Sequence, residues 1–490
     1  MSWTPPRRSA PGRPDTRRVR PRTLLDRIWD AHLSVGPADG SHSPTSGPDA
    51  LEVDRILLHE HQLGLLGRAA LAPAQPARFA DRVVVCSDQQ MPTSDDHTDG
   101  PRLDAQLLAS VDRLERASDL TGIPVFGPGD HRGGVVNVVA AEQGMVLPGD
   151  VVVAADAHVS TFGALGALAL VVADGEVPAI VAEGCVARER PGVVRLGVSG
   201  SLAADAGPKD LALWLLGRLG PGAVHRKIVE LGGPVIRALS VESRMTLCNV
   251  AVESGALAVV IAPDQAVVDY LAGRPFVPDG QTWNPRFDHW SSLVSDHDAE
   301  IDGDLGLIAD RIAPQVTWGT DPDQVAPLDG VVPDPRPEAA GDRDRRALVD
   351  QGLEPGRPLR EVEVDQVFIG SCANARIEDL RAAADVVRGA RAHVPAWVVP
   401  GSWPVRRQAE AEGLHRVFLD AGFEWRSPGC SLCIGANGDA VAPGARLAST
   451  ANRPTRGLAG PRARIHLLGP TAAAATALTG RLTAPGDVAR

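Results

Sequence analysis

The stretch VDQVFIGSCANARIEDLRAAADVV at residues 364–387 carries the strongest structural signal in the chain. It predicts a buried strand over 365–369, a tight turn, and a helix with acidic residues in its first turn. Ser371, Cys372 and Asn374 fall in the turn, directly after the carboxyl end of the strand. Ligands of open α/β sheets bind at that end of the strands. We therefore expect a polar site around this turn.

A second cysteine motif, PGCSLCIGAN at 428–437, places Cys430 and Cys433 in a C-x-x-C pair. Two thiolates at this spacing can bind one metal centre, but the pair alone also fits a redox couple or half of a zinc site. A zinc site needs four ligands, and His466 is a candidate to complete one. Three thiolates, with Cys372 included, suit an iron–sulfur cluster in which one iron has no protein ligand. Such an iron can act as a Lewis acid on a hydroxyl or carboxylate.

Apolar segments of two kinds alternate along the rest of the chain. Short β-rich runs predict strands, and longer runs with apolar residues three to four apart predict helices. The expected strands are 82–85, 134–140, 150–154 and 257–262, and the expected helices are 23–31, 53–71 and 210–219. Strands that alternate with helices predict an α/β fold with mostly parallel sheets.

The composition excludes several classes of protein. The chain has 490 residues, 44% of them hydrophobic and 22% charged, which suggests about three globular domains. Its formal net charge of -12 argues against general binding to nucleic acids or anionic membranes. No apolar run reaches the ~18 residues of a membrane span, and six cysteines are too few for a disulfide scaffold of this size. We therefore expect a cytoplasmic protein with reduced thiols.

Basic residues are distributed unevenly. Only two of the 49 Lys and Arg residues are lysines, Lys209 and Lys227, which we attribute to a GC-rich genome rather than to function. Residues 1–22 hold many arginines among Pro and Ser and lack an apolar core, so they are not a secretory signal. We expect this segment to be a disordered basic tail.

Five segments together resemble the aconitase superfamily, and most closely the large subunit of 3-isopropylmalate dehydratase. The segments are VFIGSCANARIEDLRAA at 367–383, SPGCSLCIGANGDAVAPGARLASTANR at 427–453, VTWGTDPDQVAPLDG at 316–330, RALSVESRMTLCNVAVESGA at 237–256 and AAEQGMVLPGDVVVAADAHVSTFGALGALAL at 140–170. The similarity runs from about Thr23 to the C-terminus.

The resemblance implies an α/β fold of three domains around a 4Fe-4S cluster, whose ligands would be Cys372, Cys430 and Cys433. The implied domains are 23–198, 199–315 and 361–490, with 316–360 as a linker or surface excursion. Family members move water across a carbon–carbon bond of a 2-hydroxy di- or tricarboxylic acid. In fused aconitases a fourth, swivelling domain supplies a serine base and an arginine. No such segment follows the third domain, so we expect a separate small subunit, as in isopropylmalate dehydratases.

The resemblance also assigns roles to individual residues. The catalytic residues would be Asp88, Asp156, His158 and Glu253. The residues that bind the substrate would be Asn249, Ser371, Asn374, Asn452 and Arg453. The partners implied are the hydroxy-acid substrate and the small subunit, with no nucleic acid and no membrane.

The sequence departs from the family pattern at several of these places. Gln89 and Asn137 each stand where the family has a His, Ala157 replaces a Ser, Leu65 replaces a Gln, and Leu458 replaces an Arg. A glutamine forms hydrogen bonds but cannot shuttle a proton, and the lost arginine removes a bidentate carboxylate clamp. Arg456 lies close to the lost arginine in the sequence.

These departures leave more than one hypothesis. The first is a specialised active enzyme with a substrate other than isopropylmalate, because the cysteines and most polar site residues are kept. The second is a catalytically silent, cluster-bearing subunit that pairs with an active paralogue. A third, the same fold with a divalent metal or no cluster, is opposed by the three intact cysteines.

Overall fold

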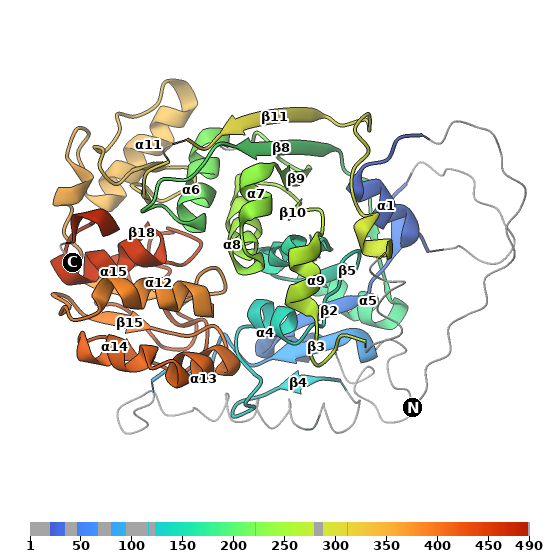
Figure 1. Ribbon diagram of the computed structural model, residues 1–490, viewed down its shortest axis with the longest axis horizontal. Helices are drawn as coiled ribbons and strands as arrows, with labels where there is room; N and C mark the ends of the chain where they lie inside the picture. Colours follow the sequence, from blue (N-terminus) through green and yellow to red (C-terminus); the bar gives the residue numbers. More distant parts are fainter. Residues whose placement is uncertain are drawn as a thin grey trace, which may run out of the picture.

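The structure of the protein is a computed structural model (Figure 1), and it describes residues 20–34, 47–66, 80–94, 116, 123–220, 222–278, 288–310 and 312–488. Three parallel sheets with helices packed around them confirm the expected α/β fold. Residues 1–19 of the expected basic tail lie outside the described residues. The end of that segment is held in place, because Arg20 pairs with Glu300 and Arg22 with Asp30.

The first parallel sheet has the strand order β4-β3-β2-β5-β6. Its strands are β2 (Arg55–His59), β3 (Val83–Cys86), β4 (Val125–Phe126), β5 (Val151–Ala154) and β6 (Leu168–Val171). Beside it lie α4 (Val136–Glu142), α5 (Val177–Glu183) and the 3-10 helices η1 (Glu60–Leu66) and η3 (Ala157–Leu165). The central strands are almost wholly buried, as parallel strands covered on both faces should be.

Two predictions for this region are wrong. The described part of the 53–71 segment, which ends at Leu66, forms β2 and then η1 instead of the expected helix. A short apolar run buried on both faces cannot be distinguished from a helix by its periodicity. The 134–140 segment, expected to be a strand, contains the start of α4. Val135, at the N-cap of this helix, has no side chain that can cap it. Asp88 does so instead, since its Oδ2 accepts a hydrogen bond of 2.8 Å from the amide of Val136.

The second parallel sheet has the strand order β10-β9-β8-β11. Its strands are β8 (Val193–Ser199), β9 (Ile228–Gly232), β10 (Ala258–Val260) and β11 (Gly303–Ile308), and its helices are α6 (Pro208–Leu219), α7 (Pro234–Ala238), α8 (Val241–Ala251) and α9 (Gln265–Leu271). The first and second sheets join closely where η3 meets β10. A Cβ atom on Gly163 would lie 1.7 Å from the carbonyl oxygen of Val259, so only glycine allows this approach.

The third parallel sheet has the strand order β16-β15-β14-β17-β18. Its strands are β14 (Gln366–Ile369), β15 (Ala396–Val398), β16 (Glu424–Trp425), β17 (Arg446–Ser449) and β18 (Arg464–Leu467), and its helices are α12 (Ile377–Val387), α13 (Trp403–Ala411), α14 (Leu414–Asp420), α15 (Pro470–Thr479) and the 3-10 helix η8 (Ser431–Cys433). The predicted strand–turn–helix at 364–387 is confirmed as β14, the turn and α12.

The 316–360 stretch, expected to be a linker, is folded. It contains most of a two-stranded antiparallel sheet of β12 (Gln315–Thr317) and β13 (Val325–Pro327), followed by α11 (Glu338–Gln351). Asp344 on α11 is fully buried and accepts hydrogen bonds from Arg336 and Gln324. The many Pro and Asp residues that suggest a linker therefore serve turns and buried ion pairs instead.

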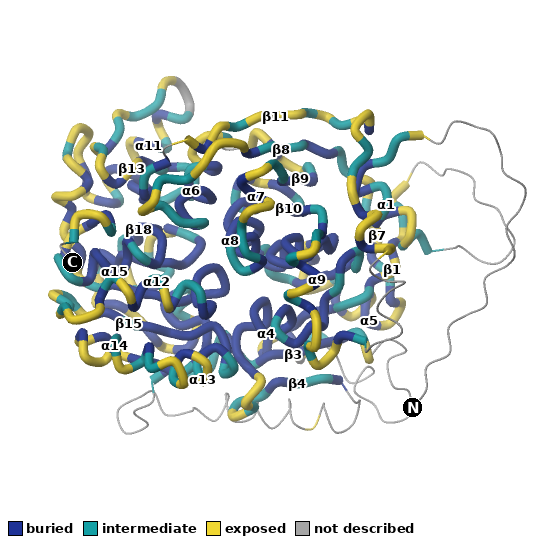
Figure 2. The backbone as a smooth tube through the Cα atoms, in the orientation of Figure 1, coloured by how far each residue is buried: buried dark blue, intermediate teal, exposed yellow. Residues whose placement is uncertain are grey.

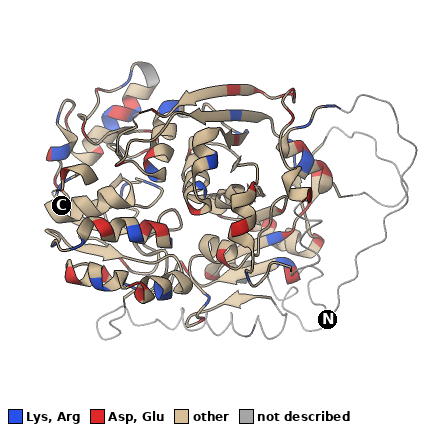
Figure 3. Cartoon of the chain, viewed as in Figure 1, with Lys and Arg blue, Asp and Glu red and all other residues tan. Residues whose placement is uncertain are grey.

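The remaining elements lie near the N-terminus. Helix α1 (Leu24–Ala31) is capped by Thr23, and β1 (Asp49–Glu52) pairs with β7 (Cys185–Arg188). Figure 2 shows the buried chain concentrated where the sheets meet, and Figure 3 shows acidic and basic residues mixed along outer helices such as α11 and α13. Among the described helices, none is both long and apolar enough to cross a membrane.

Candidate functional site

The structure brings the three predicted cysteine ligands to the edge of the third sheet. Cys372 lies in the turn after β14, and Cys430 and Cys433 lie at the two ends of η8. Ser371, which precedes Cys372, has a positive φ angle of 82°. Ser431, which follows Cys430, has a positive φ angle of 47°. Left-handed backbone at a non-glycine residue costs about 1–3 kcal/mol and is typical of functional turns. Both turns are thus held in a conformation that the surrounding structure must support.

Amide groups surround the sulfur of Cys372. The Nδ2 atoms of Asn249 and Asn452 donate to its Sγ over 3.2 Å and 3.3 Å, and Asn452 Nδ2 also lies 3.1 Å from Asn249 Oδ1. The thiol of Cys433 donates to Asn452 Oδ1 over 3.5 Å. Donors directed at a sulfur stabilise a thiolate and tune a metal centre bound to it. The predicted substrate residues Asn249 and Asn452 therefore lie among the cysteines.

The three thiols need a metal to lose their protons. Burial raises the pKa of Cys372, and burial followed by the charge of Asp156 raises the pKa of Cys433 to about 11. Burial also places the pKa of Cys430 well above its usual value, and the charges of the other two cysteines add to the effect. A bound metal centre reverses this cost, because coordination deprotonates a thiol outright.

Among the described residues, the three cysteine sulfurs do not all lie within 4.8 Å of one another. Within the described ranges, His59, Glu60 and Asp88 form a group of three potential metal ligands whose atoms all lie within 4.8 Å of one another. The cysteines form no such group. In a cluster each thiolate binds a different iron, so the ligands stand farther apart. The zinc alternative loses its fourth ligand, because both ring nitrogens of His466 are engaged, by the carbonyl of Thr317 and by Arg446.

A chain of charged side chains lies on the other side of the cysteines. His158 Nδ1 lies 3.0 Å from Asp156 Oδ1, and its Nε2 lies 3.0 Å from Glu253 Oε1. Arg453 Nε donates to the same oxygen of Glu253 over 2.8 Å. Burial alone would lower the pKa of His158, but Asp156 and Glu253 outweigh it and raise this pKa to about 10. Both ring nitrogens of His158 therefore face a carboxylate, and this favours the imidazolium form.

His59 extends this chain and was not among the predicted site residues. Its Nδ1 lies 2.7 Å from Asp88 Oδ1, and its buried Nε2 lies 3.8 Å from Asp156 Oδ2. Asn137, which replaces a family histidine, donates to the same oxygen of Asp156 over 2.9 Å. Asp88 itself is wholly buried, with its other oxygen capping α4, so it positions His59 rather than facing a ligand. The signal was available, since His59 and Cys86 are paired at the ends of neighbouring strands and Asp88 follows two residues later.

Two predicted residues support the cysteine turn instead of joining the charged chain. Ser371 Oγ accepts a hydrogen bond of 3.0 Å from the amide of Ala373. Asn374 Nδ2 donates to Thr246 Oγ1 over 3.2 Å and to Asp379 Oδ1 over 3.0 Å, which ties the turn to α8 and α12. Ser371 also forms a hydrogen bond with Cys433, which lowers the pKa of that thiol, so it contacts a predicted cluster ligand as well.

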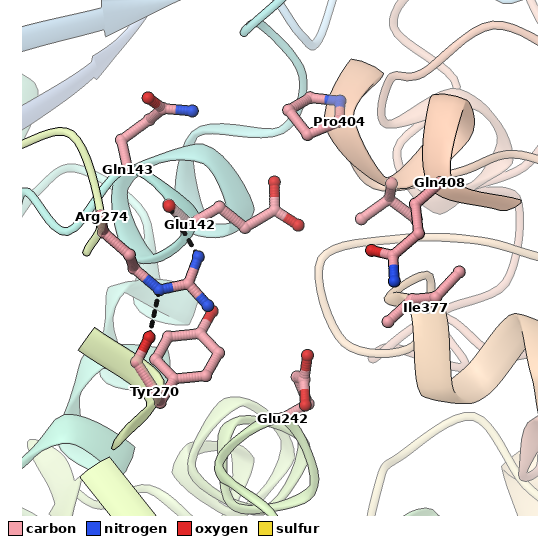
Figure 4. Close-up of a pocket in the computed structure, with 9 residues that line it drawn as sticks. Glu142, Gln143, Glu242, Tyr270, Arg274, Ile377, Pro404 and Gln408 are labelled. Carbon is pink, nitrogen blue, oxygen red and sulfur yellow. Dashed lines mark hydrogen bonds between the residues drawn. The ribbon is translucent and has the colours of Figure 1, made fainter. Parts of the chain in front are cut away.

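A separate polar cavity of about 150 Å³ lies between α4, α9 and α13, apart from the cysteines. Figure 4 shows Glu142, Glu242 and Arg274 directed into it. The polar groups largely satisfy one another: Glu142 accepts 2.6 Å from Ser402 Oγ, and Arg274 stacks on the Tyr270 ring at 3.8 Å. None of the three predicted cysteine ligands lines this cavity.

The sequence profile of the aconitase family (aconitate hydratase) matches residues 26–480. The chain belongs to the aconitase family. Among solved structures it is similar to the holo-form of aconitase X from Thermococcus kodakaraensis, at 11% sequence identity and a TM-score of 0.41, over 88% of this chain and 89% of that one.

One departure of this aconitase-family member is not compensated nearby. Leu458, where the family has an arginine, is partly buried against the apolar core. Arg456, the nearest arginine in the sequence, is engaged in an ion pair with Asp350 at the surface. A second arginine clamp for a carboxylate is therefore not supplied from this segment.

Proposed function

We propose that the protein is a 4Fe-4S-dependent hydro-lyase or isomerase that moves water across a 2-hydroxy di- or tricarboxylic acid. One observation carries the proposal: buried Cys372 and Cys430 and half-buried Cys433 lie with the amides of Asn249 and Asn452 at one site, beside a histidine–carboxylate–arginine chain. Cys372, Cys430 and Cys433 would hold the cluster. Membership of the aconitase family supports the reaction type.

The side chains present suit the binding of a hydroxy acid. When bound, the cluster supplies a Lewis-acidic iron for the substrate hydroxyl and one carboxylate. Arg453 uses its Nε on Glu253, which leaves its terminal nitrogens for a second carboxylate, and its side chain is 41% exposed. Asn249 and Asn452 fix the cysteine side of the site through their bonds to Cys372.

His158 is the residue best placed to act as the acid. It is protonated at neutral pH, because its pKa is about 10. In our proposal His158 donates its proton to the leaving hydroxyl as the carbon–oxygen bond breaks, which releases water. A base removes the proton from the neighbouring carbon, and the alkene takes water back at the other carbon. We assign that base, and a further arginine, to a separate small subunit.

The substrate in this proposal is an isopropylmalate-like or other substituted malate that differs from isopropylmalate itself, and the chain is the large subunit of a dehydratase of the 3-isopropylmalate type in the cytoplasm. Gln89 and Leu458 replace residues that serve in such enzymes, so we favour a specialised pathway over leucine synthesis. The contact of 2.7 Å between His59 and Asp88 holds His59 beside Asp156, which is consistent with an active site in this proposal.

The second candidate is a catalytically silent, cluster-bearing subunit that pairs with an active paralogue. The engagement of Arg456 by Asp350 favours it, because the lost clamp is then not replaced within this segment. A Gln89→His variant separates the two functions. No gain in turnover over an inactive parent, together with tight binding to a partner, supports the silent subunit.

The proposed function is tested by anaerobic reconstitution of the full chain with iron and sulfide, together with its small subunit. We expect a brown protein with about four irons per chain that dehydrates 2-alkylmalates. Cys433→Ser should lose iron and activity, whereas Cys185→Ser, at a half-buried cysteine on β7, should lose neither. A wild-type protein that stays colourless after reconstitution overturns the proposal.

A further inference from the structure

One buried lysine lies next to the site without belonging to the acid–base chain. Lys209, in the first turn of α6, has no exposed surface. Its Nζ donates to the carbonyl oxygens of Thr450 over 3.1 Å and Ala451 over 2.6 Å. These carbonyls directly precede Asn452 and Arg453, the residues that bond Cys372 and Glu253. Lys209 thus connects α6, which packs with the second sheet, to the segment that follows β17 and leads to Asn452 and Arg453.

The composition makes this lysine unusual. In a chain where 47 of the 49 Lys and Arg residues are arginine, even buried cations such as Arg244 and Arg376 are arginines. The other lysine, Lys227, is half exposed and pairs with Asp302. An ammonium is a compact point charge, whereas a guanidinium is a planar fork that needs more room. Two carbonyl oxygens that converge on one nitrogen therefore explain why lysine is kept at 209.

The charge of Lys209 has no carboxylate bonded to it. Both of its acceptors are neutral carbonyls, and the adjacent Asp210 spends its carboxylate on the amides of Gly207 and Gln315. Burial lowers the pKa of Lys209 to about 8, and the opposing charges that act on it come first from Cys372 and Cys433. The buried ammonium therefore lies within electrostatic range of Cys372 and Cys433 as well as on the two carbonyls that it contacts.

We propose that Lys209 is a positioning residue of the site, which clamps the 450–451 carbonyls and supplies the buried positive charge that offsets the thiolates. This rests on the proposed function. The clamp holds Asn452 towards Cys372 and Arg453 towards Glu253, while the ammonium stabilises the anionic form of the cysteines from behind. Residues that orient metal ligands in this way typically change metal affinity or activity 10- to 100-fold when removed.

Three full-chain variants test the proposal beside the wild type: Lys209→Met, Lys209→Gln and, as the matched control, Lys227→Met. Without iron, hydrogen exchange of the 446–453 segment reports the clamp. After anaerobic reconstitution, the reduction potential of the cluster and the iron that the protein retains report the effect of the Lys209 charge. With the small subunit and a 2-alkylmalate, KM and kcat are measured separately.

We expect Lys209→Met to exchange faster at 450–453, to shift the cluster potential to a lower value, and to raise KM about 10- to 100-fold. Lys209→Gln, which keeps a donor without the charge, should recover exchange protection but not the potential. Lys227→Met should match the wild type in every measurement. Wild-type exchange and wild-type potential in Lys209→Met overturn the inference. If the wild type takes up no cluster, the proposed function fails, and the exchange measurement still decides whether the clamp exists.

Discussion

Replacing Glu253 with glutamine tests the chain of charges that links Arg453 to His158. Glu253 Oε1 lies 3.0 Å from His158 Nε2 and 2.8 Å from Arg453 Nε. The pKa of His158, about 10 against the usual 6.5, corresponds to roughly 5 kcal/mol of net interaction with its carboxylates. A hydrogen bond to a charged group contributes about 1.5–3 kcal/mol. Glu253→Gln should therefore lower the pKa of His158 by about 1–2 pH units.

The sign of the activity change follows from which form is stabilised. A raised pKa means that the folded protein favours the imidazolium, so the variant loses this proton at lower pH. If His158 is the acid, the alkaline limb of the kcat/KM profile moves to lower pH by the same amount. The imidazole titration is followed by NMR in the iron-free protein, and the kcat/KM profile in the reconstituted enzyme.

The matched control is Glu176→Gln, because Glu176 pairs with Arg188 at the surface, away from the site. That variant should leave both titrations unchanged. An unchanged imidazole titration in Glu253→Gln would show that the two side chains are not coupled, and this would refute the reasoning. A shifted titration with an unchanged rate profile would instead remove His158 from the acid role.

Three stability changes follow from the packing around the site. Asp88→Asn weakens the ion pair with His59 and should lower the free energy of unfolding by about 1–3 kcal/mol, measured by urea titration at pH 7. Asp344→Asn weakens the pair with Arg336, which keeps Asp323 as a second partner, and should cost about 1–3 kcal/mol, read as a lower Tm; an unchanged Tm would contradict the contribution of this ion pair. Gly163→Ala drives a methyl group into the Val259 carbonyl and should cost about 1–3 kcal/mol or more, with loss of folded yield as the readout.

The sequence predicted the elements whose local and long-range preferences agree. The strand and helix of 364–387 have turn residues, acidic first-turn side chains and a buried apolar run in the right order, and the structure follows them. The 134–140 segment failed because its valines favour a strand locally. In the folded chain Asp88, which follows β3, accepts a hydrogen bond from the first amide of α4. Such long-range capping leaves no trace in the local sequence.

The sequence also predicted some residues of the candidate site and missed others. The cysteines lie in recognisable motifs, and His158, Glu253 and Arg453 meet as the resemblance implies. Lys209 was assigned to genome composition, because nothing in its neighbourhood shows that α6 reaches the end of β17. Side chains whose partners lie more than two hundred residues away can be placed only once the sheets are docked.

This assembly from distant segments has a consequence for biogenesis. Cys372, Cys430 and Cys433 leave the ribosome after most of the chain, but Asn249 and His158 must already be folded beside them before the thiols find donors and counter-charges. Domains fold largely as units during synthesis, so the proposed cluster would be inserted only after the third sheet has docked on the first two. A maturation factor would then have to recognise an almost complete protein, not a nascent cysteine loop.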